Sequence, residues 1–316
     1  MSTIRERIKN SALFEAYRLL MKERETDIYF FQNLLHETSI IERIGREGKF
    51  GEVYKGKISN YLVSIKKIPL QLVDLELLLT NKHLDRGMIY NENTIWREIY
   101  LLKLCSKLLK NKKSIHLPFF HFFAYTSNNY WNKDASKNVP YIYSYSELAN
   151  EDLKSWCRIN RTEKEWKSCF LQIFFSIYCL QYFSGFLHND LHWGNVLVSK
   201  VKKGGYWVYY VNNEEYYIKN EGFLFMIWDF GFADIIPEIR YCSEHSKSCQ
   251  DFIKILNTPK WINKYFETVK VPISIKQFCL STRMQEFKSM NHLLAQVVSK
   301  WCKKYDDENV IETFYL

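Results

Sequence analysis

The 316-residue sequence lacks any run of about 18 apolar residues without a charge, the length that a membrane-spanning helix requires. Its first 25 residues carry charges throughout, so the apolar core of a signal peptide is also missing there. No C-x-x-C pair occurs among the eight cysteines, and several fall in helical apolar patterns, which favours buried, idle thiols. These absences predict an intracellular protein, in the cytoplasm or nucleus, that has no membrane partner.

Internal repeats and low-complexity segments are absent too, whereas apolar residues make up 47% of the chain and aromatic residues 17%. This composition is sufficient to bury one large core or two smaller ones. The net charge is +9, but the lysines and arginines are spread along the chain. The densest basic cluster, KLLKNKK at 107–113, is more typical of the solvated end of a helix than of a nucleic-acid patch. We therefore expect a monomer that needs no nucleic acid.

The spacing of apolar residues changes along the chain and indicates two kinds of structure. The expected elements are an amphipathic helix at 4–25, antiparallel strands at 40–68, a helix at 94–109, short strands at 119–125 and 141–148, and an apolar helix at 165–186. Strands first and helices later predict an α+β fold with two lobes. The predicted domains are an N-terminal helical extension at 1–36, a β-rich N-lobe at 37–148 and a mainly helical C-lobe at 149–316.

Closely spaced glycines in GREGKFGEVY (45–54) lie between two expected strands, where backbone N–H groups can approach phosphate oxygens. The nearby sequence VSIK (63–66) places Lys66 where its ammonium could reach phosphates bound under that loop. Glu98 is polar on an otherwise apolar helix face, so we expect its carboxylate to hold Lys66 extended. A glycine hairpin without a ligand and an exposed helix acid are the structural alternatives for these two features.

The stretch HNDLHWGNVLV (188–198) lies between an apolar helix and a short strand, and its polar residues fit a catalytic loop. Asp190 would be the base that accepts or orients the proton of an attacking hydroxyl, while Asn195 would turn its side-chain oxygen onto a divalent cation. In MIWDFGFAD (226–234), Asp229 follows an apolar strand and would bind the same cation. Each motif alone is common, but their conjunction in this order is highly specific.

With these motifs, residues 37–300 resemble the eukaryotic protein kinases. The resemblance implies a bilobal fold with ATP and Mg²⁺ or Mn²⁺ in the cleft between the lobes. DLHWGNVL, with His192 and Trp193, and the hairpin-like insert at 202–222 are similar to the haspin-like kinases. That likeness implies a reduced activation segment without A-P-E, and it makes Asp251 the acid that holds the catalytic loop.

The kinase resemblance also implies roles for individual residues. Those expected to bind ATP are Ile44, Gly45, Gly48, Gly51, Val53, Lys66, Glu98, Glu147, Leu148, Ala149 and Asp152. Within this set, Glu147 to Ala149 would contact adenine and Asp152 would bind the ribose. The residue before this segment, Ser146, would be the gatekeeper. The expected catalytic residues are Asp190, Lys66 and His192, and the expected metal ligands are Asn195 and Asp229.

Three departures from the kinase pattern change the expectations. The glycine loop has one residue more than G-x-G-x-x-G, so either Gly45 or Arg46 takes the first glycine position. Asn189 replaces the arginine that in many kinases receives an activation-loop phosphate, and the segment from Gly231 to Asp251 is short, so activity should not require phosphorylation there. His192 replaces a lysine and carries less positive charge near neutral pH, which predicts slower catalysis.

The sequence thus predicts a serine/threonine protein kinase that acts on a protein substrate. A small-molecule kinase of the aminoglycoside or choline type is an alternative, although VSIK, DFG and Trp193 stand against it. A pseudokinase scaffold is a second alternative, supported by the altered glycine loop. A chromatin substrate rests on analogy alone. The lysine-, asparagine- and tyrosine-rich composition would suit a large DNA virus or a reduced intracellular parasite.

Overall fold

The structure, a computed structural model, describes only part of the chain. The described residues are 3–4, 7, 38–44, 51–58, 60–71, 74, 95–126, 140–235, 249–285, 287, 289–296, 298–304 and 306–316. Apart from residues 4 and 7, the helix expected at 4–25 therefore lies outside the described residues, as do Gly45, Gly48 and all of 236–248.

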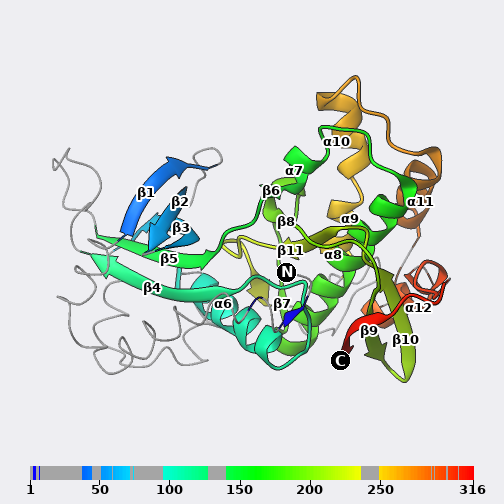
Figure 1. The fold of residues 1–316 in the computed structure, drawn as a ribbon, viewed down its shortest axis with the longest axis horizontal. Helices are drawn as coiled ribbons and strands as arrows, with labels where there is room; N and C mark the ends of the chain where they lie inside the picture. The colour runs from blue at the N-terminus through cyan, green and yellow to red at the C-terminus, as the bar shows by residue number, and fades with distance from the viewer. Residues whose placement is uncertain are drawn as a thin grey trace. The chain divides into compact units, whose positions relative to one another are not determined.

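The chain divides into two compact units (Figure 1). Unit 2 comprises Arg7–Ser106 and Pro118–Leu148, and unit 1 comprises Met1–Glu6, Lys107–Leu117 and Ala149–Leu316. The three domains expected from the sequence stay a prediction. Sheet and helix content together make an α+β fold that is compatible with a bilobal kinase-like architecture, which confirms the predicted fold class.

A five-stranded antiparallel sheet forms the centre of unit 2, with the strand order β1-β2-β3-β5-β4 (Figure 1). Its strands are β1 (Thr38–Arg43), β2 (Glu52–Ile58), β3 (Tyr61–Pro69), β4 (Phe120–Thr126) and β5 (Tyr141–Glu147). Helix α6 (Ile95–Lys110) begins in this unit. The β-branched and aromatic residues that predicted strands here suit a half-buried pleated surface.

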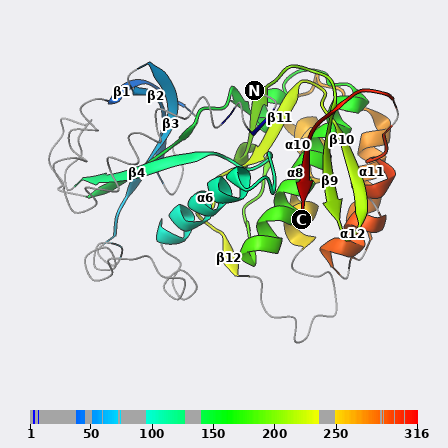
Figure 2. The same ribbon diagram turned by 60° about the horizontal axis from the view of Figure 1, so that its bottom comes forward.

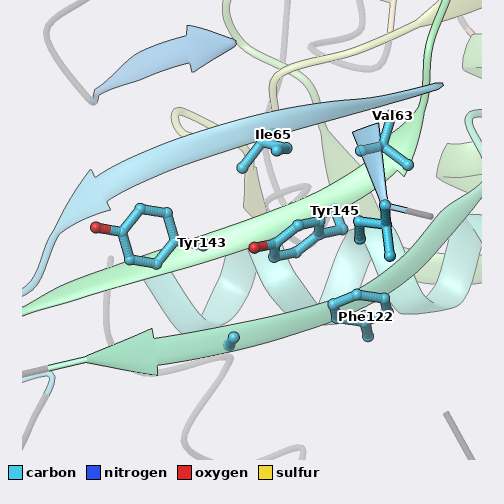
Figure 3. Close-up of a cluster of buried hydrophobic side chains, with 7 residues drawn as sticks. Val63, Ile65, Phe122, Tyr143 and Tyr145 are labelled. Atoms are coloured by element: carbon cyan, nitrogen blue, oxygen red, sulfur yellow. The ribbon is translucent and has the colours of Figure 1, made fainter. Parts of the chain in front are cut away.

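The core of unit 2 comes from side chains that project from one face of this sheet. Val63 and Ile65 on β3 meet Tyr143 and Tyr145 on β5 and Phe122 on β4, and all five are at least 96% buried (Figure 3). The rings of Phe122 and Tyr145 stack with centroids 4.5 Å apart. Each fully buried apolar side chain contributes about 1.5–3 kcal/mol. Because side chains alternate along a strand, the residues between these core positions face the other side of the sheet.

The longest helix of unit 1, α8 (Glu163–Ser184), is largely buried, and shorter helices accompany it. The shorter helices are α7 (Leu153–Trp156), α9 (Gln250–Ile255), α10 (Thr258–Tyr265), α11 (Ile273–Arg283) and α12 (Met290–Gln296), with 3-10 turns η1 (Trp193–Asn195) and η3 (Val298–Lys300). Thr162 and Glu165 form a capping box at the start of α8, and Gly185, at φ 72°, ends it. Gln172, fully buried on α8, binds the backbone of Phe223 and Phe225 and so fixes the strand that leads to Asp229.

In the part of unit 1 that the structure describes there are also three small sheets, more β-structure than the sequence predicted for it. Their strands are β6 (Glu151–Asp152), β7 (Phe186–Leu187), β8 (Val196–Lys200), β9 (Tyr206–Val211), β10 (Glu214–Lys219), β11 (Phe223–Ile227), β12 (Asp234–Ile235) and β13 (Val310–Tyr315). The insert at 202–222 forms the β9–β10 hairpin, whose turn residues Asn212 and Asn213 have φ of 51° and 65°. Strand β13 pairs in parallel with β9 (Figure 2).

Within the part of the chain that the structure describes, no helix is long and apolar enough to cross a membrane. The seven cysteines described there are all buried and free, as the sequence predicted. Burial raises the pKa of the Cys279 thiol to about 12, so this thiol stays protonated at neutral pH. Cys242 lies outside the described residues.

Candidate active site

Lys66 and Glu98 form a buried ion pair inside unit 2. The Lys66 ammonium lies 2.6 Å from Glu98 Oε1, and the two side chains are only 3% and 2% exposed. Lys66 sits on the sheet face opposite Val63 and Ile65, which directs it away from the apolar cluster. Glu98 stands in the first turn of α6, where the helix dipole favours a negative charge. A buried charge requires a partner, so each residue of the pair fixes the other.

Near the start of β2, the structure describes the end of the expected phosphate loop. Gly51 has φ 137°, and a Cβ added there would lie 2.2 Å from the carbonyl oxygen of Lys67, so no other residue fits without backbone movement. The Ile44 N–H donates to the Val53 carbonyl at 2.8 Å, which joins the strands on either side of the loop. Ile44, Gly51 and Val53, all expected to bind ATP, are therefore held close together.

The expected adenine segment follows the end of β5. Ser146 is fully buried, and the Glu147 N–H donates to the Phe119 carbonyl at 2.9 Å. The Glu147 carboxylate accepts the Phe119 N–H at 2.7 Å and pairs with the guanidinium of Arg7. Leu148 is half-buried.

Unit 1 continues this segment at Ala149, which is also half-buried. Asp152, the expected ribose ligand, begins helix α7 by accepting the Ser155 N–H at 2.7 Å. Its side chain is thus oriented by the fold without a nucleotide.

The catalytic loop predicted at 188–195 begins with a turn fixed by Asp251. This 99% buried carboxylate accepts the backbone N–H groups of His188 and Asn189 at 2.7 and 3.0 Å. His188 is fully buried, and its Nε2 lies 2.8 Å from the Trp228 carbonyl oxygen. Asn189 has φ 63°, a left-handed conformation that asparagine tolerates better than most residues. The fold therefore imposes the turn that presents Asp190.

Asp190, His192 and Asn195 come together after this turn. The Asn195 Nδ2 donates to the Asp190 carbonyl oxygen at 2.9 Å and lies 3.3 Å from its Oδ2. His192 Nδ1 accepts the Gly194 N–H at 3.0 Å, so the neutral ring carries its proton on Nε2, which lies 3.8 Å from Asp190 Oδ2. The side chains of Asp190 and His192 are 40% and 45% exposed. The group combines a reachable carboxylate, an amide and an N–H donor.

Two neighbours keep His192 in place. Trp193 is 92% buried and packs against the rings of Trp261 and Phe266, with centroids 5.6 and 5.7 Å away. A Cβ added at Gly194 would lie 2.9 Å from the His192 ring. Trp193 therefore anchors the loop, and Gly194 leaves room for the imidazole.

Asp229 follows strand β11 and adopts φ 65°, a second left-handed position in this region. The preceding Trp228 N–H donates to the Asn195 carbonyl at 2.8 Å, which joins the two backbones that carry the expected metal ligands. Because the Asn195 Nδ2 is directed to Asp190, its Oδ1 is the atom that fits a cation. Mg²⁺ in nucleotide sites takes one or two protein ligands together with waters and phosphates, so Asn195 and Asp229 fit it.

Among the described residues, no group of three or more His, Cys, Asp or Glu side chains could hold a metal ion. Two contacts at the site were missed by sequence reasoning. The Lys254 ammonium binds the Asn189 carbonyl, and its position three residues after Asp251 on α9 was a usable signal. The second missed contact joins Arg7 to Glu147, which lies 140 residues away along the chain, so no local sequence pattern indicates it.

No protein-family model matches the chain. A frog virus 3 (isolate Goorha) protein with the name "Putative serine/threonine-protein kinase 019R" is 38% identical to the chain over 71 residues. The matched stretch covers 22% of this chain and 8% of the viral protein. Together with the fold, this similarity supports a kinase-like relationship.

Proposed function

We propose that the protein is a serine/threonine protein kinase that uses ATP and Mg²⁺ or Mn²⁺. The observation that carries the proposal is the turn at 188–195, in which Asp251 fixes the backbone and Asn195 contacts Asp190 while the Asp190 carboxylate stays open to solvent. This arrangement leaves one carboxylate within reach of a substrate hydroxyl. The buried Lys66–Glu98 pair supports the same proposal, because it holds an ammonium ready for phosphate oxygens.

In the proposed reaction, Lys66 orients the phosphates and the segment Glu147–Ala149 receives the adenine. The oxygen of a serine or threonine hydroxyl forms a bond to the γ-phosphorus, and the bond from that phosphorus to the β,γ-bridging oxygen breaks, so that ADP leaves. Asp190 accepts the hydroxyl proton, and the His192 Nε2–H donates to a phosphoryl oxygen. Asn195 and Asp229 would hold the divalent cation, which would supply positive charge beside the phosphates.

We also propose a haspin-like branch within the kinases. DLHWGNVL and the insert that forms the β9–β10 hairpin support it. The proposed partner is a protein substrate inside a cell, which for a viral kinase is the host cell. The chain is proposed to act as a monomer and without nucleic acid.

The test is transfer of label from [γ-³²P]ATP into a mixture of cell proteins by the purified chain, with and without a chelator of divalent cations. We expect cation-dependent label that acid hydrolysis recovers as phosphoserine or phosphothreonine. Label found only in small molecules would support a small-molecule kinase instead. ATP binding without any transfer would support a pseudokinase, and either result overturns the proposal.

A further inference from the structure

Arg7 is one of the few described residues near the start of the chain, and its side chain is 99% buried in unit 2. Its Nε lies 3.1 Å from Glu147 Oε2, and its Nη2 contacts Glu147 Oε1. The contact is therefore bidentate, which fixes orientation as well as position. The same Glu147 Oε1 also accepts the Phe119 N–H at 2.7 Å.

Glu147 occupies the last position of β5 and is the first residue of the segment proposed for adenine. Its backbone pairs with Val63 on β3 and donates to the carbonyl of Phe119, the residue directly before β4. Both carboxylate oxygens of Glu147 are engaged by groups from elsewhere in the chain. The direction in which the backbone leaves β5 at Leu148 therefore depends on these contacts.

We infer that Arg7 is a positioning residue for nucleotide binding, which acts through Glu147. This inference rests on the proposed function. By holding the Glu147 side chain against Phe119, Arg7 keeps the backbone of Glu147 and Leu148 in one conformation before any nucleotide arrives. Arg7 thereby contributes to affinity for ATP without touching it. Preorganisation of this kind lowers the ordering that ligand binding must otherwise impose.

A purely stabilising role would have different consequences. Replacing both partners of a buried ion pair by apolar residues often costs no stability, whereas removing one partner does cost stability, so stability alone does not separate the roles. Two variants of the full-length chain separate the roles. Arg7→Met removes the cation and keeps an apolar stem, and Glu147→Gln keeps an acceptor for the Phe119 N–H while it loses the charge. Lys55→Ala removes a lysine from an exposed pair with Glu42 in the same unit and serves as the matched control.

Three readouts are needed: KM for ATP, kcat, and hydrogen exchange of the Phe119 and Glu147 amides. For Arg7→Met we expect KM to rise about tenfold with kcat changed less than about threefold, which is the pattern of lost nucleotide positioning. In the Arg7→Met/Glu147→Gln double variant, KM should rise no more than in the single variant with the larger rise, because both substitutions remove the same ion pair. Exchange at Phe119 should accelerate in Arg7→Met while amides in β3 keep their protection. Lys55→Ala should change none of these values.

An unchanged KM in Arg7→Met, with faster exchange at Phe119, would overturn the inference, because Arg7 would then stabilise only the local structure. Unchanged exchange would overturn it as well, because the segment would then be fixed by other contacts. Failure of the proposed function looks different: the parent protein itself would bind no ATP. In that case the exchange measurement still decides whether Arg7 positions the Glu147 backbone.

Discussion

The Lys66–Glu98 pair and the Asp190 loop supply charges to the same proposed reaction, but they are built in opposite ways. Lys66 and Glu98 are 3% and 2% exposed and satisfy each other, whereas Asp190 and His192 keep 40% and 45% of their side-chain surface open to solvent. A closed pair keeps its geometry with or without a ligand. An open carboxylate can receive a substrate hydroxyl and release its product.

The start of the open loop is nevertheless held by hydrogen bonds to buried groups. Asp251 is 99% buried and accepts the backbone N–H groups of His188 and Asn189, while the fully buried His188 ring contacts the Trp228 carbonyl. The Lys66–Glu98 pair in unit 2 is itself buried, whereas at Asp190 and His192 in unit 1 the supporting residues are buried and the two side chains are partly exposed. Substitutions should therefore reduce stability most at the pair and reduce turnover selectively at the loop.

The largest effect on stability is expected for Lys66→Met. It leaves the Glu98 carboxylate buried without its cation, which costs about 3–5 kcal/mol of folding free energy. Turnover should fall as well, because the phosphates lose an ammonium. Urea denaturation measures the first effect and an ATP assay the second. Lys66→Met/Glu98→Leu should recover stability but not turnover. A stability loss below about 1 kcal/mol in the single variant would show that the pair is not buried in solution.

A smaller effect is expected for Asp251→Asn. In the parent, each of the two Asp251 carboxylate oxygens accepts one backbone N–H group. The asparagine amide has only one acceptor oxygen, so one charged hydrogen bond is lost at a cost of about 1.5–3 kcal/mol. The loop loosens while the core stays intact, and turnover should drop at least tenfold with ATP affinity retained. Amide exchange at His188 and Asn189 reports the loosening directly. Equal exchange rates in variant and parent would contradict the described support of the loop.

The smallest effect is expected for Lys67→Met, the neighbour of Lys66 on the opposite face of β3. Burial lowers the pKa of Lys67, and the nearby Glu52 carboxylate only partly opposes this. Between that lowered pKa and the ordinary value near 10.5, the unfolded chain binds more protons than the folded one, so the parent gains stability as pH rises. At lower pH both states are protonated and the full cost of the buried charge remains.

Replacing Lys67 should therefore raise Tm at pH 7, and this advantage should shrink towards pH 10. Thermal melts of parent and variant across that range measure the difference. If Lys67→Met destabilised the protein as much as Lys66→Met, the two lysines would not differ in the way that their contacts describe.

Local pattern was sufficient for much of the fold. Alternating side chains predicted the strands around Lys66, and apolar spacing placed α6 and α8 within about two residues of their bounds. The single stretch HNDLHWGNVLV suggested a shared role for Asp190 and Asn195, and the structure holds them in contact. These features depend on residues that are close in sequence, which is why the sequence alone predicts them.

Other features depend on distant partners and leave no local signal. The Arg7–Glu147 contact spans 140 residues, and the parallel pairing of β13 with β9 joins segments about 100 residues apart. The left-handed backbone of Asp229 carries no sequence mark either, since aspartate occupies many conformations. Tertiary packing decides such features.

In the proposed function, Asp190 serves phosphoryl transfer and not nucleotide binding. The most direct test compares the parent with Asp190→Asn, which keeps the shape of the side chain and a carbonyl acceptor near the Asn195 Nδ2. We predict a loss of about a thousandfold in cation-dependent transfer to protein hydroxyls, with ATP affinity within about twofold of the parent. Full activity of Asp190→Asn, or loss of ATP binding in step with activity, would contradict the account.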